Sequence, residues 1–229
     1  MMDLLTNNIK LLQGDCLERM KEIESGSIDM VLTDPPYGTT ACKWDSIIPL
    51  EPMWEQLKRV IKPNGAIVLF GSQPFTSTLT CSNLKMFKYD WYWNKRKPVN
   101  FLNAKKQPLR KVESISVFYS KQCTYNPQGL TYSPKINKRG NSTETNREHG
   151  RSNFSEYSNY PVNTLDFKSD NGLHPTQKPV ELMKYLIKTY TNEGETVLDF
   201  TMGSGSTGVA AKNLNREFIG IELDKDYYY

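Results

Sequence analysis

Short apolar segments alternate with helical patterns along this 229-residue chain, and that alternation restricts its fold more than any other feature. Seven segments have the length and apolar content of strands: residues 9–13, 28–33, 65–71, 87–94, 113–119, 195–200 and 217–222. Five others have helical periodicity or helix boundary residues: 16–24, 50–61, 74–84, 177–191 and 206–214. Their order predicts an α/β fold, and the length allows one sizeable core with an insertion.

The segment 28–33 ends in an unusual tetrapeptide, Asp34-Pro35-Pro36-Tyr37. Proline has a fixed φ and no N–H, and a residue that precedes proline favours extended geometry. We therefore expect the Asp34 carboxylate, the backbone carbonyls and the Tyr37 ring to stand at the carboxyl edge of the sheet, where α/β proteins bind ligands. Two acceptors beside an aromatic ring suit a planar NH2 group. The alternative is an ordinary turn, in which Asp and Pro are common.

A second candidate site follows the segment 195–200, where Asp199-Phe200-Thr201-Met202-Gly203-Ser204-Gly205 leads into a helix. Glycines allow close approach of a ligand to the backbone. Gly203, Gly205 and Gly208 satisfy the GxGxxG pattern in a strand–turn–helix context, and Glu222 ends the next strand, where it could accept bonds from a ribose. The pattern predicts a nucleoside-cofactor pocket, the alternative being a merely tight turn. A P-loop is excluded because no Gly-Lys-Ser/Thr follows.

Basic residues concentrate in one segment of a chain whose net charge is only +4. Residues 85–111 contain nine Lys and Arg residues and one acid, Asp90. The aromatic residues interleaved with them are Tyr89, Trp91, Tyr92, Trp93 and Phe101. This combination favours binding of a nucleic acid, with Lys95, Arg96, Lys97, Lys105, Lys106 and Arg110 as candidate contacts. The alternative is a solvated face over a core strand.

The region from 121 to 173 differs in character from the rest. Its centre, residues 137–158, is polar with few aliphatic side chains, which predicts a long inserted loop. Cationic and aromatic residues occur along it. They are consistent with a second contact surface for nucleic acid, and the alternative is a plain disordered insertion. We treat residues 1–229 as one domain, with 121–173 as a candidate target-recognition segment.

Other function classes receive little support. No stretch approaches the roughly 20 apolar residues of a membrane helix, and the N-terminal residues lack the pattern of a secretory signal. Four scattered cysteines without a CxxC pair predict free thiols in a reducing compartment, and two histidines make a metal site unexpected. We therefore expect a cytoplasmic protein that needs no metal.

The two motifs together resemble those of the amino-group DNA methyltransferases. The tetrapeptide 34–37 precedes the glycine turn, as in their permuted β group, and His174-Pro175-Thr176-Gln177-Lys178-Pro179 resembles the segment that leads into the cofactor strand there. Gly14-Asp15-Cys16 and Trp44-Asp45 also look like features of the family. The resemblance implies a Rossmann-like sheet of seven strands, mostly parallel with one antiparallel strand, and helices on both faces. It implies S-adenosylmethionine as methyl donor and duplex DNA with a flipped base.

Roles follow from the resemblance residue by residue. The catalytic set would be Asp34, Pro35, Pro36 and Tyr37. The cofactor set would be Asp15, Asp34, His174, Thr176, Lys178, Asp199, Phe200, Gly203, Gly205, Ser206, Thr207 and Glu222. Asp in the first position of the tetrapeptide favours N6 of adenine as target. The alternatives are an N4-cytosine or RNA methyltransferase on the same fold, a nicotinamide-dependent oxidoreductase, and an inactive DNA-binding homologue.

The resemblance also sets expectations about context. It implies a prokaryotic or phage-encoded protein, leaves open a homodimer and a restriction nuclease as partner, and gives no recognition sequence. In the family a further helix usually follows the strand that ends here at Glu222, whereas the given sequence stops at Tyr229. Without that helix we expect apolar surface to be exposed and cofactor binding to weaken.

Overall fold

The computed structural model describes residues 4–5, 8–39, 45–137, 153–169 and 177–225. They divide into two compact units. The larger unit comprises Met1–Asn126 and Asn163–Tyr229, and the smaller one comprises Pro127–Val162. Among the described residues, no helix has the length and apolar content needed to cross a membrane.

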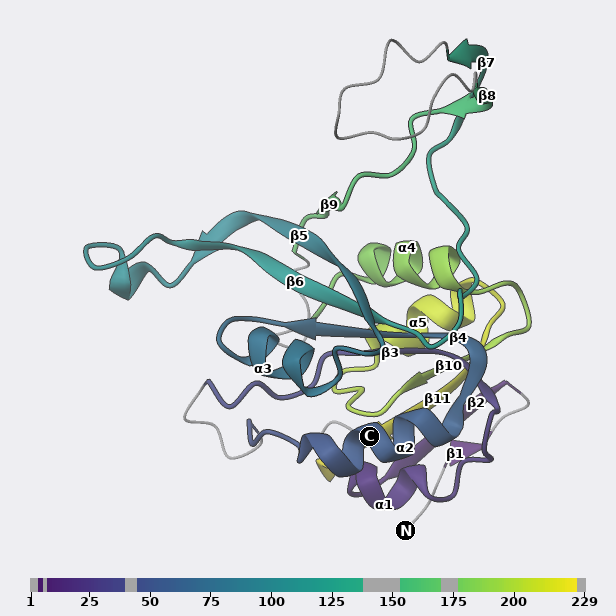
Figure 1. Ribbon diagram of the computed structural model, residues 1–229. Coiled ribbons are helices and arrows are strands. Elements are labelled where there is room, and N and C mark those ends of the chain that lie inside the picture. The colour runs from purple at the N-terminus through teal and green to yellow at the C-terminus, as the bar shows by residue number, and fades with distance from the viewer. Residues whose placement is uncertain (1–3, 6–7, 40–44, 138–152, 170–176, 226–229) are drawn as a thin grey trace. The chain divides into compact units, whose positions relative to one another are not determined.

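A mixed sheet of nine strands forms the centre of the larger unit (Figure 1). In spatial order the strands are β1 (Leu4–Leu5), β2 (Ile9–Gln13), β11 (Glu217–Glu222), β10 (Thr196–Asp199), β3 (Ile28–Thr33), β4 (Ile61–Gly71), β6 (Arg110–Phe118), β5 (Phe87–Val99) and β9 (Thr164–Asp166). From β2 to β4 every neighbouring pair is parallel, and β6 runs antiparallel to both β4 and β5.

The seven strands expected from the sequence are all present, and β6 is the expected antiparallel strand among them. The sheet gains two short edge strands, β1 and β9, that the sequence did not reveal. Two or three residues are too few to show a period of two, so hydrophobic patterning cannot identify such strands.

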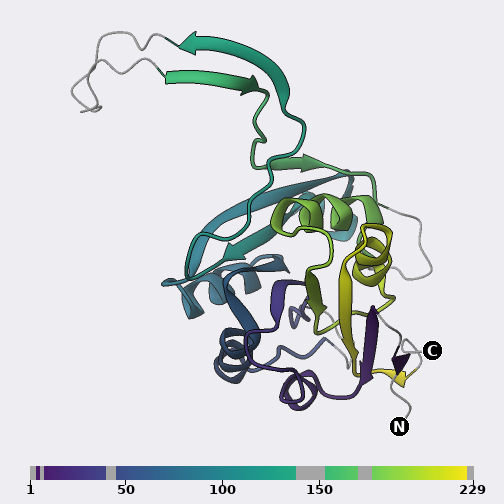
Figure 2. The same ribbon diagram turned by 90° about the vertical axis from the view of Figure 1, so that its right-hand side faces the viewer.

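Helices cover both faces of this sheet (Figure 2). They are α1 (Cys16–Met20), α2 (Leu50–Val60), α3 (Phe75–Ser82), α4 (Val180–Tyr190) and α5 (Ser206–Asn213), with a 3₁₀ turn, η1, at Phe101–Asn103. Side chains alternate along a strand, and in β4 Val68 and Phe70 join the core under α4 and α5 while Ile67 and Leu69 join the core under α1, α2 and α3. Burial on both faces explains the continuous apolar runs of the parallel strands.

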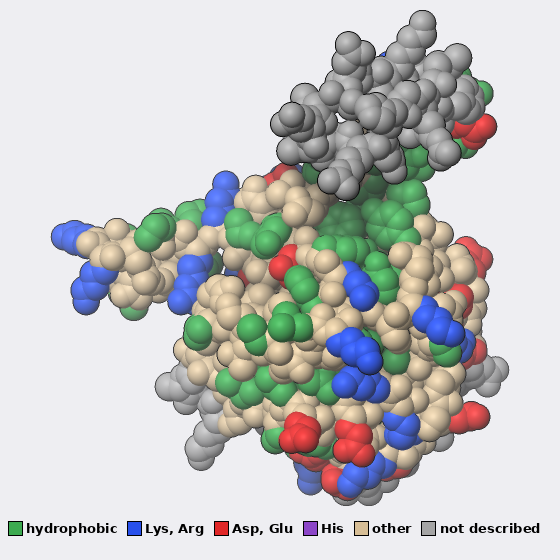
Figure 3. Space-filling view, viewed as in Figure 1, with side chains coloured by type: hydrophobic (Ala, Val, Ile, Leu, Met, Phe, Trp, Pro, Cys, Tyr) green, Lys and Arg blue, Asp and Glu red, His purple; other side chains and the backbone are tan. Residues whose placement is uncertain are grey.

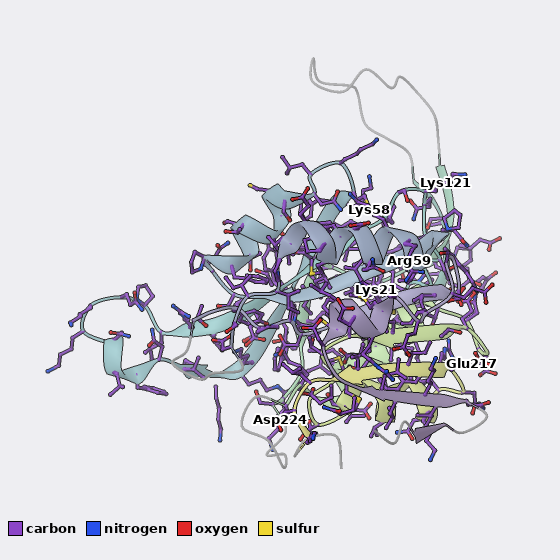
Figure 4. All side chains as sticks on the ribbon, turned by 90° about the horizontal axis from the view of Figure 1, so that it is seen from below. Lys21, Lys58, Arg59, Lys121, Glu217 and Asp224 are labelled. Carbon is purple, nitrogen blue, oxygen red and sulfur yellow. The ribbon has the colours of Figure 1, made fainter. Side chains whose placement is uncertain are left out.

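One arginine joins α2 to the end of α1. Arg59, in the last turn of α2, donates from Nη2 to the Met20 carbonyl at 2.6 Å and from Nη1 to the Ile23 carbonyl at 2.7 Å. The Met20 carbonyl, at the end of α1, also accepts from Ile23 N at 3.0 Å, and the Ile23 carbonyl lies just beyond that end. Figure 4 shows Arg59 beside Lys58 on α2, over the underside of the sheet.

The smaller unit is a β-hairpin of β7 (Thr131–Asn137) and β8 (Asn153–Ser158). Tyr132 and Tyr157 pair directly across it, with ring centroids 5.8 Å apart in an edge arrangement. The expectation of one long loop over 121–173 is therefore wrong for these segments and for β9. Polar residues that alternate with aromatic ones can pair as strands without a buried face, so low hydrophobicity alone did not exclude a hairpin.

Candidate active site

Four parallel strands bring acidic residues to one edge of the sheet. β2, β11, β10 and β3 are neighbours, and their carboxyl ends lead to Asp15, Glu222, Asp199 and Asp34 respectively. In Figure 4 Glu217 and Asp224 mark the two ends of β11, and Asp224 lies at the carboxyl end. The two motifs, far apart in sequence, thus meet where α/β sheets bind ligands.

The Asp34 carboxylate is held from both sides. Its Oδ1 accepts a hydrogen bond from the Tyr37 hydroxyl, and its Oδ2 accepts one from Lys178 Nζ. The Asp34 carbonyl accepts from Thr201 Oγ1 at 3.2 Å. Within the described part of the chain, no group donates to the carbonyl of Pro35, although Pro35 is buried. That carbonyl therefore remains an acceptor beside the carboxylate.

The Tyr37 ring is fixed by its neighbours. It stacks on Phe75 of α3 with centroids 5.3 Å apart and planes 27° apart. Burial, together with the nearby Asp34 charge, raises the pKa of Tyr37 well above its usual value. The phenol therefore stays protonated and acts as a donor to Asp34.

Asp45 orders the loop that follows the tetrapeptide. Its Oδ1 accepts from the backbone N–H groups of Tyr37 at 2.8 Å and Gly38 at 2.9 Å, and its Oδ2 accepts from Thr39 N at 2.8 Å. The sequence singled out Asp45 only as a feature of the resembled family. The structure gives it a physical role, because three N–H groups converge on one buried carboxylate.

Lys178 belongs to a chain of alternating charges. Its Nζ contacts Asp34 and lies 3.6 Å from Glu113 Oε2, and Glu113 Oε1 pairs with Lys95 Nζ. Burial favours the neutral amine, but the charges of Asp34 and Glu113 outweigh that effect and raise the pKa of Lys178. Lys178 is therefore a cation at neutral pH.

Sequence reasoning missed Glu113. Glu113 lies in β6 between the exposed first residues and the buried last ones. Because β6 runs antiparallel to β4, the N-terminal half of β6 lies at the carboxyl edge of the parallel strands. Its Oε2 is buried without a hydrogen-bond partner. The available signal was an acidic residue at the first position of the expected strand 113–119.

Asp199 links the two motifs from within the core. Its Oδ1 accepts from Thr33 Oγ1 and its Oδ2 accepts from Thr207 Oγ1 at 2.6 Å. Only 3% of Asp199 is exposed, and burial raises its pKa to about 6 despite the bonds from these hydroxyls. Asp199 is thus a buried carboxylate that accepts hydrogen bonds from Thr33, before the tetrapeptide, and from Thr207, after the glycine turn.

The glycine turn is open above its backbone. Gly203 and Gly205 have φ values of +50° and +77°, and a Cβ atom placed on either would meet nothing within 4 Å. Gly203 N donates to Glu222 Oε2 at 2.8 Å, and Asp224 N donates to Glu222 Oε1 at 2.8 Å. A carboxylate offers about four acceptor sites, so Glu222 keeps capacity for a ligand.

The remaining predicted cofactor residues lie at or near this edge. Asp15 is exposed and caps α1 through Oδ1, which accepts from Leu17 N at 2.9 Å. Phe200 is buried, and Ser206 begins α5. Most of the residues predicted to bind the cofactor thus lie at this edge of the sheet, whereas His174 and Thr176 lie outside the described residues. Among the described residues there is also no group of three or more side chains suited to hold a metal ion.

The basic segment forms most of the β5–β6 hairpin. Its predicted nucleic-acid contacts differ in their exposure to solvent. Arg96, Lys97, Lys105, Lys106 and Arg110 are exposed, whereas Lys95 is paired with Glu113 and its side chain is only 16% exposed. The expectation that the aromatic residues of this segment contribute to nucleic-acid binding is wrong for Trp91 and Trp93. Both are 3% exposed core residues, because strand alternation turns the odd-numbered positions inward.

Sequence comparisons place the chain among DNA methylases. The sequence profile of the N6/N4 family, described as DNA methylase, matches residues 28–229. The type II methyltransferase M.HpaI of Haemophilus parainfluenzae is 29% identical, over 95% of this chain and 71% of that protein. The type II methyltransferase M2.LlaDCHI of Lactococcus lactis subsp. cremoris is 28% identical, over 96% of this chain and 86% of that protein.

Solved structures agree with this assignment. The crystal structure of an M1.HpyAVI–SAM complex is similar with a TM-score of 0.66 and 27% identity, and the match covers 96% of each chain. The cytosine-N4-specific PvuII DNA methyltransferase matches with a TM-score of 0.69 over 97% of this chain and 84% of that one. At 18% identity the PvuII likeness concerns the fold alone.

Proposed function

The chain belongs to the N6/N4 DNA methylase family, and within that family we propose that it methylates N6 of adenine in duplex DNA after flipping the base. One observation supports the chemistry most directly. The Asp34 carboxylate and the Pro35 carbonyl, two acceptors at the end of β3, lie beside the Tyr37 ring and share an edge with the open glycine turn.

S-adenosylmethionine is the methyl donor, and it supplies an electrophilic methyl group on a sulfonium centre. The residues present fit a nucleoside of this kind, because open space lies above Gly203 and Gly205 and a carboxylate borders it at Glu222. We assign the wall of the pocket to Phe200 and these glycines, the ribose contact to Glu222 and the adenine contact to Asp15. His174, Thr176 and Lys178 belong in the proposal to the methionine end.

Asp34 and Pro35 would activate the target amine. An exocyclic amine is a poor nucleophile because its lone pair is conjugated with the ring. Hydrogen bonds from its two protons to Asp34 Oδ1 and the Pro35 carbonyl would draw the nitrogen toward tetrahedral geometry and localise that lone pair. Positioning of this kind supplies much of the rate enhancement in group-transfer enzymes.

Tyr37 would hold the flipped base. Phe75 supports one face of its ring, so the base would stack on the opposite face and offset part of the few-kcal/mol cost of extrusion. Lys178 keeps the Asp34 carboxylate oriented while its own charge is balanced by Glu113.

Adenine is proposed over cytosine because Asp occupies the first position of the tetrapeptide, which in the resembled family mostly accompanies N6-adenine. The test is incubation with labelled S-adenosylmethionine and mixed duplex DNA, followed by sequencing that detects modified bases. We expect N6-methyladenine in one short sequence context. N4-methylcytosine would contradict the choice of base and retain the mechanism.

Substitution of Asp34 tests the mechanism itself. Asp34→Ala should lower kcat by at least about 10³-fold, since it removes an acceptor used in the transition state, while the Kd for S-adenosylmethionine changes only a few-fold. Asp166→Ala is the matched control, because Asp166 lies on β9 and its carboxylate accepts only an exposed bond from Asn94 at 2.6 Å. Substantial activity of Asp34→Ala would refute the assigned role.

Recognition of the target sequence is proposed for the inserted region 121–173, which includes the β7–β8 hairpin. The exposed cations of the β5–β6 hairpin would contact phosphates. Exchange of the inserted region with that of a relative should change the methylated sequence and leave the type of methylated base unchanged.

A further inference from the structure

The tip of the β5–β6 hairpin displays two large apolar side chains to solvent. Phe101 is 65% exposed and Leu102 is 99% exposed. The turn that presents them is ordered by polar bonds rather than by burial. Asn103 Nδ2 donates to Asn100 Oδ1 at 2.8 Å, and Lys106 N donates to the Asn103 carbonyl at 2.8 Å. Neighbouring exposed apolar side chains with polar residues around them are a feature of interaction sites.

The surroundings of the tip indicate a polyanionic partner. From Lys95 to Lys111 the sequence has seven Lys and Arg residues and no acid. Figure 3 shows blue cationic side chains on both sides of green hydrophobic ones at the end of this hairpin. Cations around an apolar projection match phosphates on either side of a stack of bases.

The hairpin extends beyond the edge of the sheet that holds the candidate active site. β5 is parallel to β4, because both pair antiparallel with β6, so its carboxyl end passes the same edge as Asp34. Its root is joined to the site by the Lys95–Glu113 and Lys178–Asp34 ion pairs. The six residue-to-residue steps from Lys95 to Phe101 span at most roughly 20 Å at about 3.3 Å per step. At 3.4 Å per base-pair step this corresponds to about six base pairs.

We propose that Phe101 and Leu102 form a wedge that inserts between base pairs of duplex DNA within about six base pairs of the target base. The inference rests on the proposed function, because it takes the substrate to be duplex DNA. Apolar side chains inserted at a base step unstack it and kink the duplex, and extrusion of a base requires local unstacking. The wedge would thus lower the cost of flipping, while the neighbouring cations hold the backbone.

Unwinding of DNA measures insertion without the need for a known recognition sequence. A relaxed circular plasmid is incubated with saturating protein and topoisomerase I, and its linking number is then determined. The wild-type chain should shift the distribution, and Phe101→Ala/Leu102→Ala should reduce the shift at least about threefold. Leu84→Ala is the control, because Leu84 is also an exposed leucine, at 64%, but precedes β5 outside the hairpin tip.

A charge variant separates insertion from attraction. Lys105→Ala/Lys106→Ala should reduce the slope of log Kd against log salt by about 2 and leave the unwinding at saturation unchanged. Phe101→Ala/Leu102→Ala should leave the slope of log Kd against log salt unchanged and reduce the unwinding at saturation. Equal unwinding by the wild type and by Phe101→Ala/Leu102→Ala would overturn the proposal. It would also be overturned if the wild type sedimented as a dimer, this variant alone sedimented as a monomer, and unwinding persisted, because the tip would then bind a second copy of the chain.

The wedge and the proposed function can fail separately. Unwinding needs no methyl transfer, so a wild-type chain that unwinds DNA but methylates no base would refute the function and support the wedge. A chain that methylates adenine and unwinds equally well without Phe101 and Leu102 would refute the wedge alone.

Discussion

Thr33 Oγ1 donates a hydrogen bond to Asp199 Oδ1 although the two residues are 166 positions apart. Thr33 directly precedes Asp34, and Asp199 ends β10 just before the turn that leads to Gly203 and Gly205. Thr201 Oγ1 extends the link, since it lies 2.8 Å from Thr33 Oγ1 and donates to the Asp34 carbonyl. The residues proposed to bind the base and those proposed to bind the cofactor are therefore fixed relative to each other by a few hydroxyl and carboxylate oxygen atoms.

This network predicts an unusual dependence of stability on pH. Burial raises the pKa of Asp199 from 3.8 to about 6, so the folded state binds a proton more readily than the unfolded state between these values. Ionised Asp199 therefore disfavours the folded state above pH 6, by on the order of 3 kcal/mol, and this penalty disappears as pH falls toward 3.8. Urea unfolding of the wild type and Asp199→Asn should show the wild type gaining relative stability from pH 7.5 to pH 4.5. A constant difference between the two proteins would contradict the raised pKa.

The glycine turn allows a test in which backbone strain is matched. Gly205→Ala and Gly194→Ala both place a side chain at a φ near +78°, with nothing within 4 Å of the new Cβ atom. Each should lower the free energy of unfolding by about 1–2 kcal/mol. Only Gly205→Ala should raise the Kd for S-adenosylmethionine, by about tenfold or more, measured by calorimetry, because only that methyl group would enter the proposed pocket. Equal affinities of the two variants would place the cofactor elsewhere.

Asp45 should matter for both stability and catalysis. Asp45→Ala leaves the N–H groups of Tyr37, Gly38 and Thr39 without their carboxylate, and we expect unfolding to be easier by about 2–3 kcal/mol. The loop after Pro36 would lose its geometry, so kcat should fall more than tenfold. Asp45→Asn should recover part of the loss because one amide oxygen can still accept two of these bonds. Thermal unfolding and steady-state kinetics check both effects.

Glu113 is expected to position Lys178 rather than to touch the substrate. Glu113→Gln removes one of the two charges that raise the pKa of Lys178, so the basic limb of the kcat–pH profile should move to lower pH. At neutral pH kcat should fall about tenfold, which corresponds to about 1.4 kcal/mol. Glu217→Gln is the control, because Glu217 lies at the opposite end of β11 from the site (Figure 4). An unshifted profile would argue against this role.

The sequence predicted the centre of the fold well because two-sided burial leaves a strong local signal. Met30, Val31 and Leu32 in β3, and their counterparts in β4, form continuous apolar runs bounded by turn residues. The motif that begins at Asp34 and the turn at Gly203 were recognisable for a similar reason, since proline and glycine restrict the backbone locally.

Features that depend on distant partners were missed or misinterpreted. Lys95 resembled a surface cation until its pairing with Glu113 was known, and that pairing depends on the register of two strands. Trp91 and Trp93 lie in a segment whose charge favoured nucleic-acid binding, but strand alternation turns these two side chains into the core. Charge counts along a sequence do not separate these two situations.

Both junctions of the smaller unit are anchored on the larger one. Asn126 N donates to the Thr189 carbonyl at 2.7 Å, and its Nδ2 donates to the Lys188 carbonyl at 3.1 Å. Asn163 accepts from Tyr92 N at 2.7 Å through its carbonyl. Because the larger unit is secured up to Asn126 and again from Asn163, we expect it to keep its fold when the length or composition of the segment between Pro127 and Val162 is changed.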